Sequence, residues 1–233
     1  MSGEIQLKNQ YTAQSVVLKT PFDEQEYYKA LVELGIQFSK DDNIFTTDYA
    51  DDNALCFDVI MLDTDVPYPC SSMMDKCDNP VVITLAERAY DEAKINKEIL
   101  EEYVEWVNPL DLECFMNICL QPEDIPFYGF EYGGYGYEGF GRQMMEWNGE
   151  PIPEWAESYF DFEQYGCDYA DGSNFIVLED GYIDFDADEV NDGYYDIDDI
   201  MDKLYWDPNY EPSDKTIQST FTGITQDAMF NFL

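Results

Sequence analysis

Net charge is the feature that most limits how this chain can fold. Its 233 residues include 51 Asp and Glu, 11 Lys and Arg and no His, so the formal charge near neutral pH is −40. A highly charged chain with few apolar residues stays disordered, because it cannot bury enough surface to offset its conformational entropy. Here 45% of the residues are hydrophobic and 16% are aromatic, which is ample for a hydrophobic core. We therefore expect a folded protein that carries its charge on the surface.

The same charge limits the possible partners. A strongly negative surface repels nucleic acid and anionic membranes, whereas it attracts a basic groove. The N-terminal sequence MSGEIQLKNQ lacks the apolar core of a secretion signal, and no stretch approaches the roughly 18 apolar residues of a membrane span. We expect a cytoplasmic protein that binds neither nucleic acid nor membrane.

The motifs give no support for catalysis or for a cofactor. Without His, the usual Ser-His-Asp and Cys-His arrangements are excluded, and no phosphate-binding glycine loop follows a predicted strand. The cysteines show neither CxxC pairs nor a disulfide-dense spacing, so we interpret them as reduced thiols that bind no metal. They are Cys56, Cys70, Cys77, Cys114, Cys119 and Cys167.

One acidic motif invites comparison with a calcium site. Asp184, Asp186, Asp188 and Glu189 form the pattern DxDxDE. An EF-hand loop starting at Asp184 would need Gly at its sixth position and Glu at its twelfth, but these are Glu189 and Tyr195. Weak, non-specific association of cations is therefore the expectation, and no metal site is predicted.

Periodicity and turn signals predict an α+β fold. Because self-repulsion opposes a single sphere, we expect an elongated chain of three small domains with an acidic C-terminal extension. The predicted parts are an N-terminal α+β domain (1–65), a central helical domain (66–126), a C-terminal α+β domain (127–185) and a partly ordered acidic tail (186–233).

In the N-terminal domain, residues 5–19 are expected to be extended. Thr20-Pro21 then predicts a helix start with Thr20 as its cap, and Gly35 predicts its end. Ala30, Leu31 and Leu34 form the apolar stripe of this helix. Short strands are predicted at 36–38, 44–47 and 55–62.

In the central domain, Asn79-Pro80 predicts the start of a helical stretch that continues to Asn108-Pro109. A further buried helix is predicted at 110–120.

The C-terminal domain is expected to begin with an irregular, aromatic connection at 127–141. A helix is predicted at 153–165, with Trp155, Tyr159 and Phe162 on its packed face and Gly166 at its end. Asp180-Gly181 predicts a hairpin between strands at 175–178 and 182–185. In the tail, a short apolar cluster predicts a helix at about 196–206.

The distribution of charge is more informative than its total. Between Arg142 and Lys203 there are 19 Asp and Glu and no Lys or Arg. Rows of acidic residues at steps of three and four place carboxylates about one helical turn, or roughly 5 Å, apart. One such row is an ordinary solvated face, but the missing Lys and Arg favour imitation of the DNA backbone. The predicted phosphate-mimicking carboxylates are Glu98, Glu102, Glu105, Glu146, Glu150, Glu154, Glu157, Asp161, Glu163 and Asp168.

Two stretches, at 149–169 and 174–185, resemble the C-terminal signature of the ArdA antirestriction proteins. That signature is a Tyr-(Ile/Phe)-Asp-Tyr-x-x-(Tyr/Phe)-Gly run followed by a hairpin with Gly in its turn. Weaker similarity at Leu85–Arg88 and Leu18–Gly35 extends the resemblance to about residues 15–185. The signature positions are filled by Tyr159, Phe160, Asp161, Phe162, Tyr165, Gly166 and Gly181.

The resemblance implies three small domains in an acidic rod, paired through the C-terminal domain into a curved homodimer that imitates bent DNA. It implies that a type I restriction-modification enzyme is the partner and that DNA recognition by this enzyme is blocked. It also implies an origin in a phage or mobile element and action inside a bacterial cell.

Other functions stay open at this point. An anti-CRISPR or another anti-defence inhibitor could use the same DNA mimicry against a different nucleic-acid enzyme. An acidic calcium-buffering or structural protein would respond to calcium, and a halophilic protein would need bulk salt for stability.

Overall fold

The computed structural model describes residues 3–36, 44–45, 57–149, 152–187 and 194–212. These residues form helices and two small antiparallel sheets, so the predicted α+β class is confirmed. The chain divides into two compact units, each built from separate segments. The first unit comprises residues 1–93, 108–120 and 194–233, and the second unit comprises residues 94–107 and 121–193.

The sheet of the first unit has three strands in the order β2-β1-β3: β1 (Gly3–Asn9), β2 (Ser15–Thr20) and β3 (Phe57–Asp63). The segment predicted to be extended at 5–19 is therefore a hairpin, in which Ile5 pairs with Leu18. The strand predicted at 55–62 is confirmed where the structure describes it. In the run predicted as a strand at 44–47, Ile44 and Phe45 are buried but lie in a turn.

The first helix, α1 (Glu24–Glu33), starts later than predicted, because its cap is Asp23 and not Thr20. Glu26 donates its N–H to the Asp23 carboxylate at 2.7 Å, and the Glu26 carboxylate accepts the Asp23 N–H at 3.1 Å. This reciprocal pair satisfies two backbone donors, whereas Thr20 belongs to β2. The predicted stripe of Ala30, Leu31 and Leu34 is buried, and Gly35 follows the helix with a φ of +75°.

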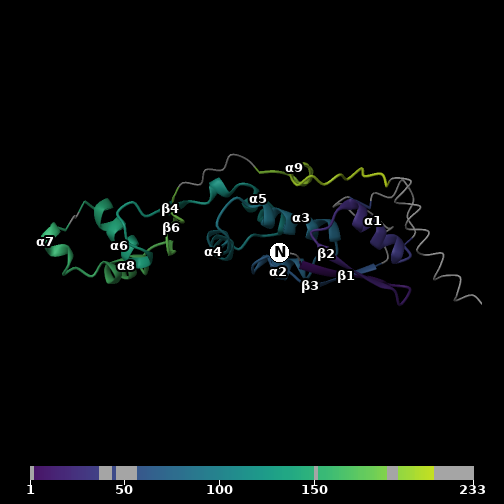
Figure 1. Cartoon of the computed structure of the whole chain (residues 1–233), viewed down its shortest axis with the longest axis horizontal. Coiled ribbons are helices and arrows are strands. Elements are labelled where there is room, and N and C mark those ends of the chain that lie inside the picture. The colour runs from purple at the N-terminus through teal and green to yellow at the C-terminus, as the bar shows by residue number, and fades with distance from the viewer. Residues whose placement is uncertain (1–2, 37–43, 46–56, 150–151, 188–193, 213–233) are drawn as a thin grey trace, which may run out of the picture. The chain divides into compact units, whose positions relative to one another are not determined.

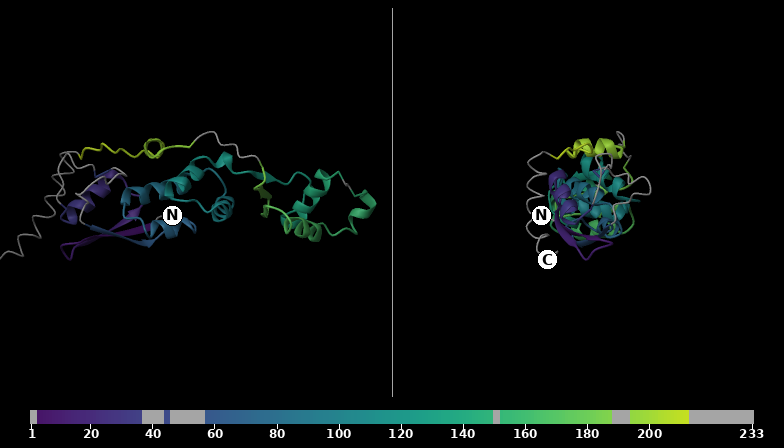
Figure 2. Two further views of the ribbon diagram at one scale, coloured as in Figure 1. Left: turned by 180° about the vertical axis from the view of Figure 1, so that it is seen from behind. Right: turned by 90° about the vertical axis from the view of Figure 1, so that its right-hand side faces the viewer.

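The helices α2 (Cys70–Met74), α3 (Pro80–Glu92), α5 (Leu112–Leu120) and α9 (Ile197–Lys203) complete the first unit. As predicted, Asn79 caps α3, and its side chain accepts the N–H groups of Val81 and Val82. Helices α3 and α5 pack together, and both lie between the sheet and α9 (Figures 1 and 2). The helix predicted at about 196–206 is confirmed as α9.

The helical stretch predicted from Asn79 to Asn108 is interrupted. Helix α3 ends at Glu92, and α4 (Lys97–Val107) begins four residues after Ala93 and belongs to the second unit. The predicted end of the stretch is correct, because α4 stops at Val107 and Asn108 adopts a φ of +51°.

The sheet of the second unit has the order β4-β6-β5, formed by β4 (Phe127–Gly129), β5 (Phe175–Val177) and β6 (Gly181–Asp184). The short 3₁₀ helix η1 (Pro122–Asp124) precedes it. The predicted hairpin is confirmed, since β5 and β6 pair with Ile176 opposite Ile183. Tyr182 of β6 is fully buried and packs with Phe140 and Met144 in the core of this unit.

None of the helices in the described ranges is long and apolar enough to cross a membrane. The division into three domains and a tail stays a prediction.

Candidate functional site

Several of the predicted acidic residues lie on or beside two helices of the second unit, α6 (Gly136–Trp147) and α8 (Phe162–Ala170). These two helices cross closely. A Cβ atom added at Gly141 would lie 2.1 Å from the Phe162 carbonyl oxygen. The prediction of an irregular connection at 127–141 is correct only for residues 130–135, because the segment also contains β4 and the start of α6. Its glycines suggest a loop by propensity, but Gly141 is needed for the close approach of the helices.

The helix predicted at 153–165 is two helices. The short α7 (Glu154–Glu157) ends before Asp161, whose carboxylate accepts the N–H of Gln164 at 3.0 Å and starts α8. Phe162 is buried as predicted, but Trp155 and Tyr159 are 78% and 86% exposed, so their predicted packing is wrong. Gly166, predicted to end the helix, lies inside α8.

Arg142 of α6 carries a positive charge beside these helices. It donates to Glu138 Oε1 from Nε at 3.1 Å and from Nη2 at 2.9 Å. Its guanidinium carbon also lies 4.0 Å from the centroid of the Phe162 ring. An ion pair and a cation–π contact therefore hold the positive charge close to the protein.

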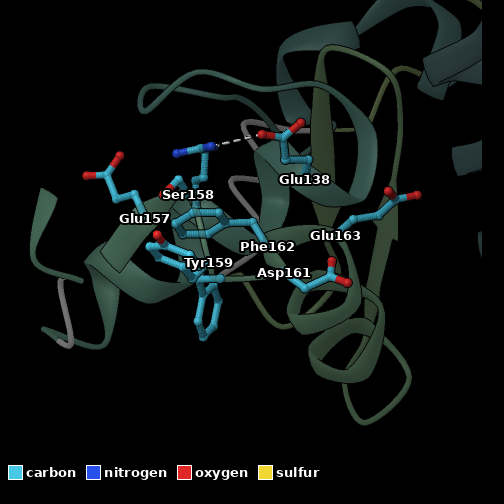
Figure 3. A pocket seen from close by; sticks show the side chains of 9 residues that line it. Glu138, Glu157, Ser158, Tyr159, Asp161, Phe162 and Glu163 are labelled. Atoms are coloured by element: carbon cyan, nitrogen blue, oxygen red, sulfur yellow. Dashed lines mark hydrogen bonds and ion pairs between the residues drawn. The ribbon is translucent and has the colours of Figure 1, made fainter. Parts of the chain in front are cut away.

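A hollow of about 340 Å³ opens between α6, α7 and the start of α8 (Figure 3). Its walls carry four carboxylates, two hydroxyl groups and aromatic rings around Arg142, an arrangement that favours cationic groups. Glu157 and Glu163 extend in opposite directions from it (Figure 3). The lining residues are Glu138, Arg142, Glu157, Ser158, Tyr159, Phe160, Asp161, Phe162 and Glu163.

The hollow brings together three of the predicted residues, Glu157, Asp161 and Glu163. Glu154 and Glu157 are both exposed on α7, but because of the helix break Asp161 does not continue their helical face. The sequence interpretation missed Glu138 and Arg142. Their i,i+4 spacing could have indicated an ion pair, had the preceding glycines not suggested a loop.

The second predicted acidic row lies on α4. Glu98, Glu102 and Glu105 are exposed, and their spacing places them on one face of the helix. The opposite face is apolar, with Ile99, Leu100 and Val104 buried. Near the end of α4, the ring of Trp106 stacks on Phe185 with centroids 3.6 Å apart.

The remaining predicted residues are separate from these groups. Glu146 is exposed on α6, and Asp168 is exposed on α8, where it accepts a hydrogen bond from the Gln164 side chain at 2.8 Å. Glu150 lies outside the described residues.

The negative field of this region acts on Cys167. Desolvation raises the pKa of its thiol, and the charges of Glu163, Asp171, Asp168 and Asp161 raise it further. The formation of a thiolate is opposed because the new charge would lie among carboxylates. The raised pKa of the Cys167 thiol therefore reflects, in part, the negative charges around α8.

A metal centre is not indicated by the geometry. Within the described ranges, no group of three or more His, Cys, Asp or Glu side chains is placed to hold an ion. Asp188 and Glu189 of the DxDxDE pattern lie outside these ranges.

The sequence was compared with models of protein families and with curated proteins. The family model described as antirestriction protein (ArdA) matches residues 12–184. A comparison with curated proteins found no match.

Proposed function

The chain belongs to the ArdA family of antirestriction proteins, and from this membership we propose that it is a non-catalytic DNA mimic. Its target is a type I restriction-modification enzyme, whose DNA-binding groove it occupies in place of DNA. It acts in the cytoplasm of a bacterial host and derives from a phage or mobile element.

The observation that carries the proposal is the arrangement of exposed carboxylates in the second unit. On α4, Glu98, Glu102 and Glu105 lie on one exposed face, spaced by about one helical turn, roughly 5 Å. Around α7 and α8, further carboxylates line the hollow and its rim. Duplex DNA carries one negative charge per roughly 1.7 Å of axis, so closely spaced rows of this kind suit a groove built to bind phosphates.

The positive charge of Arg142 does little to reduce the negative charge that this surface offers to a partner. Glu138 pairs with the guanidinium, and the Phe162 ring lies against it. The surrounding carboxylates thus stay available to Lys and Arg of a partner. Attraction between surfaces of opposite charge speeds association at low salt, and the binding energy is shared over many weak contacts.

The proposal includes a homodimer paired through the C-terminal domain, with three small domains in an elongated protomer. Two copies would double the length of acidic surface that a groove could contact.

Displacement of DNA tests the proposal. A fluorescent duplex containing the recognition sequence is bound to a purified type I enzyme, and the chain is added at several NaCl concentrations. We expect displacement that weakens as salt rises, because screening reduces contacts between charges. Poly-glutamate of equal total charge is the control and should displace far less, since its carboxylates are not held in place. Failure to displace the duplex even at low salt would contradict DNA mimicry.

A further inference from the structure

We propose that residues 194–212, termed the strap, lock the first unit in its folded form by non-covalent docking centred on Arg88 and Trp206. The strap lies beyond the family match, which ends at residue 184. Its described residues nevertheless belong to the same compact unit as β1, α1 and α3.

The strap is amphipathic and buries its apolar side. Ile200, Met201, Leu204 and Trp206 are at most 3% exposed, whereas Asp198, Asp199 and Asp202 are exposed. Helix α9 contacts α5. Removing this segment would therefore uncover apolar surface of the first unit, which costs free energy in proportion to the area exposed.

Trp206 fits a site formed by parts of the chain far away in sequence. Its indole N–H donates to the Phe45 carbonyl oxygen at 2.8 Å. Its ring lies 6.2 Å from the ring of Phe22 and 6.3 Å from that of Phe45. Both the apolar body and the polar N–H of the indole thus have partners, as a buried Trp requires.

Arg88 of α3 joins the strap to the remainder of the first unit. Its guanidinium donates to the Leu204 carbonyl oxygen at 3.0 Å and to the Phe22 carbonyl oxygen, and lies 5.3 Å from the Trp206 ring. Leu204 is the C-cap of α9, where helix carbonyls carry partial negative charge and favour a cation. Loss of Arg88 would leave these carbonyl groups without a charged donor.

Further hydrogen bonds hold the strap on either side of α9. At its start, Tyr195 donates its N–H to Asn117 Oδ1 at 2.8 Å, and Asn117 Nδ2 donates to the Tyr195 carbonyl at 3.0 Å. After Trp206, Asp207 donates its N–H to Glu24 Oε1 at 2.6 Å. The strap is thus held along its length.

The charge of the strap gives the docking a distinctive salt dependence. Residues 194–212 contain six Asp and Glu and one Lys, so this negative segment docks on a negative protein. Salt screens the repulsion between exposed charges, while the part-buried hydrogen bonds that Arg88 donates to neutral carbonyl groups are screened less. Higher salt should therefore strengthen docking, whereas it should weaken binding to a basic groove.

Cleavage of the full chain tests the proposal without any restriction enzyme. A protease recognition sequence is placed between Ala187 and Tyr194, the protein is cut, and co-elution of the C-terminal fragment is measured by size exclusion at low and high NaCl. We expect the cut wild type to retain the fragment, with tighter retention at high salt. Arg88→Met and Trp206→Ala should each weaken retention about tenfold or more, since the first removes part-buried hydrogen bonds and the second a buried ring.

The controls are Arg142→Met, which removes an arginine of the second unit, and Tyr205→Asn, which removes an 83% exposed ring beside Trp206. Both should retain the fragment as the wild type does. The milder Trp206→Phe, which loses only the N–H donor and some ring area, should weaken retention severalfold even if Trp206→Ala fails to fold. In the uncut chain, amide exchange of α9 should accelerate in Arg88→Met.

Loss of the fragment from the cut wild type at all salt concentrations would overturn the docking. Equal retention by wild type, Arg88→Met and both Trp206 variants would overturn the role of these residues.

Discussion

Gly141 of α6 and Gly166 of α8 lie against each other where the two helices cross. A Cβ atom at Gly141 would lie 2.1 Å from the Phe162 carbonyl oxygen, and one at Gly166 would lie 2.1 Å from the Tyr137 carbonyl oxygen. Each distance is far shorter than a van der Waals contact, and the neighbouring atoms are backbone. The crossing that shapes the acidic region thus requires glycine on both helices.

Substitution at this crossing should destabilise the second unit. Gly141→Ala forces the helices apart, and overpacking of this kind costs about 1–3 kcal/mol or more. Urea unfolding followed by circular dichroism would measure the loss. Gly172→Ala is the matched control, because its Cβ would meet only the Tyr169 carbonyl at 3.9 Å. Equal stability of the two variants would contradict the close crossing.

Removal of charge around α7 should weaken inhibition without unfolding the protein. The triple variant Glu154→Ser, Glu157→Ser and Asp161→Ser loses three exposed carboxylates, while Ser at position 161 can still cap α8. At about 0.5 kcal/mol for each exposed contact, potency should fall about tenfold at low salt. Competition against a DNA duplex measures this, with a thermal melt as the check on folding. Single variants should each have a small effect, and unchanged potency of the triple variant would exclude this surface as the contact.

Glu87 should make stability depend on pH. It is 1% exposed, its Oε1 accepts the Thr64 hydroxyl at 2.5 Å, and Asp91 and Asp65 are the nearby charged groups. Burial raises the pKa of Glu87, the Thr64 and Thr20 hydroxyls oppose this rise, and the two aspartates add to it. The protonated form is therefore favoured in the folded state. Protonation of Glu87 contributes fully to the free energy of unfolding below the ordinary pKa of 4.5. This contribution is lost as pH rises through the higher pKa of the folded state.

The variant Glu87→Gln tests this dependence, because it keeps an oxygen for Thr64 and cannot ionise. Its unfolding free energy should exceed that of the wild type near neutral pH, and the difference should shrink toward acidic pH. Urea titrations at several pH values would measure it. A difference that does not change with pH would show that ionisation of Glu87 is not involved.

Cys167 should act as a reporter of the acidic region. Desolvation and the surrounding carboxylates raise the pKa of its thiol, so alkylation by neutral iodoacetamide near pH 8 should be slow. Added salt screens the carboxylates and should accelerate the reaction severalfold. Peptide mass spectrometry separates Cys167 from the other cysteines. The paired variant Glu163→Gln and Asp168→Asn should react faster at low salt and respond less to added salt.

Local signals in the sequence predicted several elements correctly. Asn79-Pro80 marks the start of α3 because an Asn cap and a Pro at the first helical position act within a few residues. Asp180-Gly181 predicts the β5–β6 hairpin for the same reason. The start of α1 was predicted wrongly because two nearby residues can both cap a helix. Thr20 is the last residue of β2, and Asp23 forms the capping box.

The sequence predicted which acidic residues belong to the candidate site, but it did not predict how the helices arrange them. The acidic residues and the missing Lys and Arg are visible in the sequence, and Glu157, Asp161 and Glu163 do line one hollow. The break after α7 was missed because Trp155, Tyr159 and Phe162 are spaced like the packed face of one helix. Of these three rings only Phe162 is buried, and it lies under the Arg142 guanidinium of α6.

The sequence by itself determined the charge of the protein, its α+β class and its membership of the ArdA family, because these depend on residue types and on short-range spacing. Tertiary structure decided that Gly141 and Gly166 serve a helix crossing and that Trp206 lies beside Phe45. Both contacts join residues distant along the chain, 25 positions apart in the first case and 161 in the second. Their energy comes from the close fit of surfaces that meet only when the chain has folded.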